Sequence, residues 1–136
     1  MDILRRNTDY ALRVMAHLTI NYNVKSVSTR NIANAENIPY PISCKILQIL
    51  HKAKLVNSSM GPRGGFALAR APAQITLLQI IEAIQGRLTL NCCLVNDDAC
   101  PRQVNCAVNK KLINLQQQIE QYLDEITLKE LLKDGS

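Results

Sequence analysis

Apolar residues fall at helical spacing near the start of the chain. Within residues 7–22 they recur every three or four positions and share one face: Ala11, Val14, Met15 and Leu18. This pattern predicts a helix that ends near Tyr22. The side chain of Asn7 or Thr8 is expected to cap its N-terminus, and Asp9 lies in the first turn, where the helix dipole favours a carboxylate.

Two further helices are predicted, one on each side of the segment ENIPYP. Ser28 or Thr29 can cap the first of them, and Pro39 and Pro41 disfavour helix at the residues before each proline. The second helix is expected to bury one face, made of Ile42, Ile46, Ile49 and Leu50. It is expected to turn the other face outward, with Ser43, Cys44, Lys45 and Gln48. Two short helices joined by a tight turn match the helix-turn-helix motif, and an ordinary helical hairpin has the same pattern.

A β-hairpin is predicted directly after these helices. The stretches VNSS and FALAR have the composition of short strands, and MGPRGG between them has the glycines and proline of a turn. A hairpin in this position is the wing of a winged helix. Its tip carries Arg63, and the flanking glycines Gly64 and Gly65 allow close approach to a phosphate or to the minor groove.

The next helix has clear signals at both ends. Thr76 and Gln79 have the spacing of a capping box, and Gly86 is a typical C-terminal stop. Its buried stripe is predicted to contain Leu77, Ile80, Ile81 and Ile84. We expect this helix to pack under the wing.

A long helix is predicted after Cys106. Its apolar residues are separated by 4, 3, 4, 3 and 4 positions, as in the a/d seam of a coiled coil. The seam consists of Val108, Leu112, Leu115, Ile119, Tyr122 and Ile126. Homodimerisation through this seam is the favoured interpretation, and packing on the rest of its own chain is the alternative. The run TLKELL predicts a short last helix, capped by Thr127 with Glu130.

Charge divides the 136-residue chain into two halves. Residues 1–70 hold ten Lys and Arg against three acids, whereas residues 71–136 hold six against eight. No acid occurs between Glu36 and Glu82. This asymmetry indicates a polyanion partner for the first half, and a solvated basic face is the alternative that charge alone does not exclude. The helix-turn-helix pattern and the wing favour double-stranded DNA as that partner. The predicted DNA-binding residues come from the two short helices and the wing: Ser28, Thr29, Arg30, Tyr40, Pro41, Ser43, Cys44, Lys45, Arg63, Gly64 and Gly65.

Four of the five cysteines lie in the stretch NCCLVNDDACPRQVNC, residues 91–106. The start MDILRRNTDY has no apolar run typical of a signal peptide, which predicts a cytoplasmic protein with reduced thiols. Structural zinc sites use closely paired cysteines, whereas the pattern here is Cys93-x6-Cys100-x5-Cys106, with Cys92 as an alternate to Cys93. An iron–sulfur cluster accepts such spacing. Three cysteines leave one ligand position for a more exchangeable group, which suits a sensor.

These features together resemble the cluster-sensing winged-helix repressors typified by IscR and NsrR. The residues that carry the resemblance are TDYALR at 8–13, the helix-turn-helix, GPRGGFALAR at 61–70, the cysteine stretch and ITLKELL at 126–132. The resemblance implies a homodimer, an operator, and a 2Fe–2S or 4Fe–4S cluster on Cys93 (or Cys92), Cys100 and Cys106. Asn109 stands where IscR-like members have a histidine ligand. In NsrR-like members an aspartate of the partner protomer completes the site, and Asp9 has the matching context; a plain helix-terminal carboxylate is the alternative.

The sequence therefore predicts a mainly α fold with a small β-hairpin wing. Residues 1–86 are predicted to form the winged-helix DNA-binding domain, 87–107 the cysteine-rich cluster loop, and 108–136 the dimerisation helix and a short C-terminal helix. The predicted function is a dimeric regulator, a repressor, that binds an approximately palindromic operator and senses nitric oxide, redox state or iron and cluster supply. The alternative is a regulator without a cluster that responds through cysteine oxidation or zinc. Neither an enzyme nor a membrane partner is expected.

Overall fold

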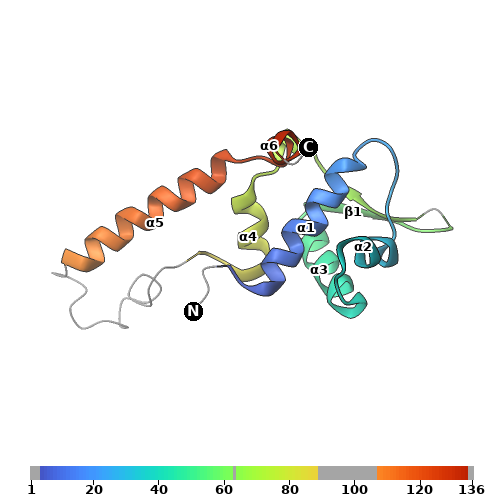
Figure 1. Ribbon diagram of the computed structural model, residues 1–136, viewed down its shortest axis with the longest axis horizontal. Coiled ribbons are helices and arrows are strands. Elements are labelled where there is room, and N and C mark those ends of the chain that lie inside the picture. The colour runs from blue at the N-terminus through green and yellow to red at the C-terminus, as the bar shows by residue number, and fades with distance from the viewer. Residues whose placement is uncertain (1–3, 63, 89–106, 135–136) are drawn as a thin grey trace.

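The computed structural model describes residues 4–62, 64–88 and 107–134, and most of them are helical (Figure 1). The elements in chain order are α1 (Arg6–Ile20), α2 (Thr29–Glu36), α3 (Tyr40–Lys52), β1 (Val56–Ser59), β2 (Gly65–Leu68), the 3-10 turn η1 (Pro72–Gln74), α4 (Leu77–Gln85), α5 (Ala107–Glu125) and α6 (Leu128–Asp134). The predicted fold class, mainly α with one two-stranded hairpin, is confirmed. None of these described helices is long and apolar enough to cross a membrane.

Helix α1 runs through the middle of the structure and packs against α3, α4 and α6 (Figure 1). Its predicted apolar face is buried as expected, and it forms the centre of the core with Ile32, Ile46, Leu47, Leu50 and Ile80. The predicted cap is wrong, because α1 begins at Arg6 and no side chain caps it. Thr8 is instead buried, and its hydroxyl donates a 2.6 Å hydrogen bond to Oε1 of Gln85 on α4.

The two helices of the predicted helix-turn-helix are α2 and α3. The hydroxyl of Ser28 caps α2 by accepting a 3.1 Å hydrogen bond from the backbone N–H of Asn31. Asn37 ends α2 in the left-handed conformation, with φ 56° and ψ 48°. Pro39 then precedes the first residue of α3, and Pro41 lies in its first turn, where its missing N–H costs no helical hydrogen bond.

The hairpin forms as predicted and is tied to the chain before α2. Its strands pair antiparallel from Val56 opposite Leu68 to Ser59 opposite Gly65. Val27 and Phe66 exchange two backbone hydrogen bonds, of 2.8 and 2.9 Å. A Cβ on Gly65 would lie 2.4 Å from the carbonyl oxygen of Val27, so the wing itself requires a glycine here. The sequence had suggested a ligand-facing reason for this glycine, and the structure supplies an internal one.

Helix α4 has the predicted capping box, with the Thr76 side chain and the Gln79 side chain each accepting from the other residue's backbone N–H. Gly86 follows its last residue as expected. The expected position under the wing is wrong, because α4 packs mainly on α1, α3 and α5. Its end therefore lies beside the start of α1, where Gln85 meets Thr8.

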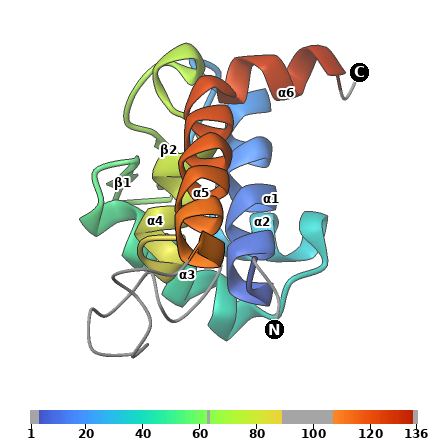
Figure 2. The same ribbon diagram turned by 90° about the vertical axis from the view of Figure 1, so that its left-hand side faces the viewer.

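The last two helices return the chain to the core. The connection between α5 and α6 is hydrogen-bonded to the start of α4. The Leu77 N–H donates to the Ile126 carbonyl and the Leu128 N–H donates to the Ile75 carbonyl, both at 3.0 Å. Leu128 is fully buried in the core that α1 organises. The C-terminal half of α5 lies beside α4, whereas its N-terminal half extends away from the other helices (Figures 1 and 2). Helix α6 thus anchors α5 and leaves part of it projecting.

Candidate nucleic-acid interface

The start of α3 presents four of the predicted contact residues. Tyr40 is 44% exposed, Pro41 and Lys45 are exposed, and Cys44 is half-buried. The prediction for Ser43 is wrong: its side chain is 0% exposed, because the buried face of α3 runs through Ser43, Ile46, Leu47 and Leu50. Its hydroxyl has no hydrogen-bond partner in the described part of the chain. Ser43 therefore packs inward and cannot touch a base in this arrangement.

Arg30 and Tyr40 form a stacked pair that joins α2 to α3. The guanidinium carbon of Arg30 lies over the Tyr40 ring, 4.7 Å from its centroid. Both residues lie in the first turn of their helices, and both are exposed. A guanidinium held against an aromatic face keeps its N–H groups free at the edge. The pair can therefore offer a positioned cation to a phosphate or a guanine edge.

The hydroxyl of Tyr40 interacts with the side chain of Cys44 on the same helix. Its hydrogen bond with the Cys44 side chain raises the pKa of Tyr40, and the electrostatic interaction with Cys44 and desolvation by burial act in the same direction. The charge of Arg30 lowers this pKa, but by less. The phenol O–H is thus engaged by the Cys44 side chain on the same face of α3.

A groove of about 300 Å³ separates the wing from the start of α2. Its lining comes from the chain before α2, from α2 and from the turn of the wing: Lys25, Ser26, Ser28, Asn31, Pro62 and Gly64. Lys25, Ser26 and Asn31 were missed by the sequence reasoning, because only the pairing of Val27 with Phe66 brings this segment beside the wing. Arg63, the predicted tip residue, lies outside the described residues.

The one acid within α2 and α3 is turned away from the predicted DNA side. Oε1 of Glu36 lies 3.1 Å from Nδ1 of His17 on α1, and both side chains are largely buried. The outer surface of α2 and α3 consequently carries cations and uncharged groups and no carboxylate. His51, in contrast, is exposed at the end of α3.

The predicted metal ligands are described only in part. Cys92, Cys93, Cys100 and Cys106 lie outside the described residues, and within those residues no group of three or more metal-ligating side chains occurs. Asp9 is described: it is exposed in the first turn of α1, and its carboxylate lies 3.0 Å from the guanidinium of Arg13. Three thiols plus one accessible carboxylate make a donor set suited to an iron–sulfur cluster with one exchangeable ligand.

The heptad seam of α5 is split into two rows. Val108, Leu115 and Tyr122 are 64%, 46% and 66% exposed. The alternating row of Leu112, Ile119 and Ile126 is half-buried. One row therefore faces the body of the chain, and the other forms an uncovered apolar strip.

Comparison with known proteins matches residues 4–134 to the family Rrf2, an iron-dependent transcriptional regulator. A protein of Aquifex aeolicus called an HTH-type transcriptional regulator is 34% identical over 90% of this chain and 86% of its own length. The regulator NsrR of Halalkalibacterium halodurans is 29% identical, with coverages of 92% and 86%.

Two solved structures have the same fold. IscR of T. potens superposes with a TM-score of 0.78 at 28% identity, covering 98% of this chain and 88% of that one. CymR of B. subtilis, named the global cysteine regulator, gives 0.81 at 26% identity and covers 96% of both chains. The relatives are transcriptional regulators and not enzymes, as the sequence predicted.

Proposed function

Because this chain belongs to the Rrf2 family of helix-turn-helix transcriptional regulators, we propose that it is a dimeric repressor controlled by an iron–sulfur cluster. The observation that carries the proposal is the cysteine pattern Cys93-x6-Cys100-x5-Cys106 placed between α4 and α5. That position joins the helix that packs on α1 and α3 to the helix with the exposed apolar row. A change in the cluster can therefore alter how two DNA-binding units are held relative to each other.

The proposed DNA contacts follow from the surface of α2, α3 and the wing. The stacked pair joins Arg30 in the first turn of α2 to Tyr40 in the first turn of α3, and Lys45 follows further along α3. These three residues are proposed to address the major groove. Ser28 and Thr29 at the start of α2, with Arg63, Gly64 and Gly65 in the wing, are proposed to contact the backbone or minor groove. A two-fold dimer then requires an approximately palindromic operator.

The proposed cluster ligands are Cys93 (or Cys92), Cys100 and Cys106, with Asp9 of the partner protomer as the fourth. When bound, the cluster would supply a site with which nitric oxide or oxygen reacts, and iron scarcity would leave that site empty. The support for this reading is the thiol spacing, the exposure of Asp9 and the similarity to proteins named IscR and NsrR. The carboxylate is the more exchangeable of the four donors, as a sensor requires.

One experiment tests the cluster directly. The full chain is purified without oxygen, reconstituted with iron and sulfide, and compared with a variant in which Cys93, Cys100 and Cys106 are replaced by serine. We expect a brown protein with visible absorption that the triple variant lacks, and a different affinity of the two for a duplex selected from random DNA. Colourless protein after reconstitution, with the same DNA affinity as the triple variant, contradicts the proposal.

A regulator without a cluster is the second candidate, and the similarity to the global cysteine regulator CymR favours it. In that case the same cysteines respond by oxidation or by binding zinc. Stoichiometric zinc in colourless protein, or DNA binding that changes with peroxide and recovers with thiols, supports this second function.

A further inference from the structure

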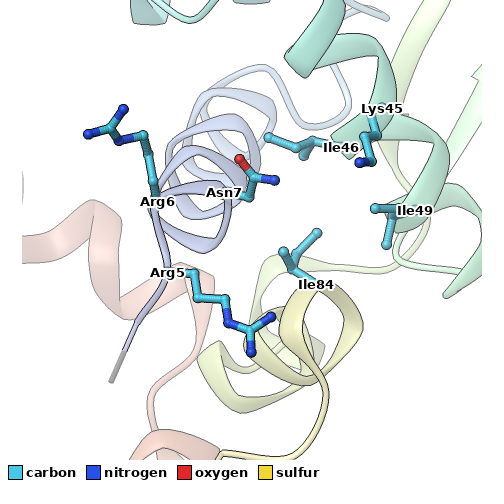
Figure 3. A pocket seen from close by; sticks show the side chains of 7 residues that line it. All are labelled: Arg5, Arg6, Asn7, Lys45, Ile46, Ile49 and Ile84. Carbon is cyan, nitrogen blue, oxygen red and sulfur yellow. The ribbon is translucent and has the colours of Figure 1, made fainter. Parts of the chain in front are cut away.

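A cavity of about 260 Å³ opens between the first turn of α1, the middle of α3 and the end of α4 (Figure 3). Its apolar floor consists of Ile46, Ile49 and Ile84. Arg5, Asn7 and Lys45 border it, and no carboxylate of residues 4–62, 64–88 or 107–134 does. In Figure 3 the Asn7 amide and the Lys45 amine are directed toward the space between them, whereas Arg6 points away. The cavity thus combines an apolar surface with a positively charged border.

Within the described residues, no acid neutralises the cations at this border. The ion pairs in the described part of the chain are Asp9–Arg13, His17–Glu36 and Arg87–Glu120, and none of them involves Arg5 or Lys45. The backbone N–H of Arg5 donates to the Gln85 side chain, and the Arg5 guanidinium extends past Ile84 at the edge of the cavity (Figure 3). Two unpaired cations beside an apolar surface favour an anion over a neutral or cationic molecule.

We propose that this cavity is an effector site for a small organic anion with a short aliphatic body. Its carboxylate contacts Lys45 and the Asn7 amide, Arg5 adds to the attraction, and its aliphatic part lies on the three isoleucines. Known ligand pockets span roughly 300–1,000 Å³, so this cavity accommodates only a small molecule. Charge-assisted hydrogen bonds fix its orientation, and burial of the aliphatic part contributes the rest of the affinity.

Occupancy has a consequence for DNA binding, and that consequence rests on the proposed function. Lys45 lies on α3, the helix proposed to enter the major groove, and the cavity links it to α1. A bound carboxylate neutralises Lys45 and competes with DNA for it. We therefore expect the anion to lower the affinity for the operator.

The site is tested without DNA, using the full chain labelled with 13C at the isoleucine methyl groups and hexanoate as the probe. We expect saturable shifts at Ile46, Ile49 and Ile84, with Ile38 and Ile75, which lie outside this cavity, unchanged. Hexylammonium should produce none of these shifts at the same ionic strength. Shifts that do not saturate, or that hexylammonium reproduces, overturn the proposal.

Two lysines of the same helix provide a matched pair of variants. Lys45→Gln should weaken hexanoate binding about tenfold, the value of one charged hydrogen bond. Lys52→Gln removes the same charge from α3 outside the cavity and should leave binding unchanged. Equal losses in the two variants would mean nonspecific ionic attraction and would overturn the site.

The proposed effect of the anion on DNA binding is tested by a separate measurement. Operator affinity is measured with and without saturating hexanoate at constant ionic strength, and we expect it to fall. Saturable binding with unchanged operator affinity would overturn the effector role. A protein that binds hexanoate but no DNA would instead contradict the proposed function, so the two failures are distinguishable.

Discussion

Arg30 lies flat against the ring of Tyr40, with its guanidinium carbon 4.7 Å from the ring centroid. This contact joins the two helices of the helix-turn-helix at the ends that face the proposed major groove. Its energy in water is small, about 0.5–1 kcal/mol at an exposed site. The stacking also orders the Arg30 side chain before DNA binds, which lowers the conformational entropy that binding would otherwise cost.

Replacing Tyr40 by leucine should therefore weaken operator binding about two- to fivefold, because Arg30 loses its support. Tyr40→Phe retains the stacked ring and should bind within error of the parent. Fluorescence anisotropy with a selected duplex measures both. A phenylalanine variant as weak as the leucine variant would show that the hydroxyl, and not the stacking, contributes the affinity.

Tyr40 also predicts a feature of the alkaline titration. Because Cys44 raises the pKa of Tyr40 above its ordinary value of about 10, the folded protein favours the protonated phenol. The contribution to stability is complete below the pKa of the unfolded chain and is lost as the pH rises through the higher folded value. In Cys44→Ala, the absorbance change of Tyr40 near 295 nm should move to lower pH. Titration of the Tyr40→Phe variant identifies which of the four tyrosines carries the shift.

The hydrogen bond from Thr8 to Gln85 should be important for stability. Thr8→Val keeps the shape of the side chain but removes the buried donor, and we expect a loss of about 1–3 kcal/mol in the free energy of unfolding. Urea denaturation measures it. Thr29→Val is a matched control, because the Thr29 hydroxyl is half-exposed and has no partner in the described residues. A loss of the same size in both variants would assign the effect to threonine replacement in general.

This hydrogen bond also shows where sequence reasoning stops. Thr76 and Gln79 were correctly predicted as a capping box, because both partners lie within one turn. Thr8 carries the same local signal as a cap, yet its partner is Gln85, 77 positions away, and the helix begins earlier. A threonine in the sequence is known to have a hydroxyl that can donate a hydrogen bond, but only the packing of α1 on α4 determines that Gln85 accepts it.

The candidate interface also combines features that the sequence predicts with features that only the structure shows. Helical periodicity placed Ile46 and Leu50 on the buried face of α3, yet it assigned Ser43 outward, since a hydroxyl is usually solvated. Packing α3 against α1 rotates the buried face by one position and takes Ser43 with it. Lys25 and Asn31 carried no motif that would place them beside the wing, because that groove exists only through the pairing of Val27 with Phe66.

Asp9 can be tested as a cluster ligand against its role in the helix. Asp9→Ala removes both the candidate ligand and the exposed ion pair with Arg13, whereas Arg13→Ala removes the ion pair alone. That pair is worth only about 0.3–0.5 kcal/mol, so neither variant should unfold. We expect the visible spectrum and the rate of reaction with nitric oxide to change in Asp9→Ala and not in Arg13→Ala. Identical spectra and rates in all three proteins would remove Asp9 from the proposed site.

The exposed row of α5 predicts how the protein assembles. Leu115 lies at the middle of this row, and a charge there should separate a dimer that pairs α5 with α5, since an unpaired charge is costly in an apolar interface. Leu115→Glu should therefore elute as a monomer in size-exclusion chromatography with light scattering, and its affinity for a palindromic duplex should fall. Gln118→Glu adds the same charge to an exposed position of α5 outside the seam and should remain dimeric. If the parent chain is itself a monomer at the concentration where it binds DNA, the row must serve another purpose and the palindromic operator is no longer required.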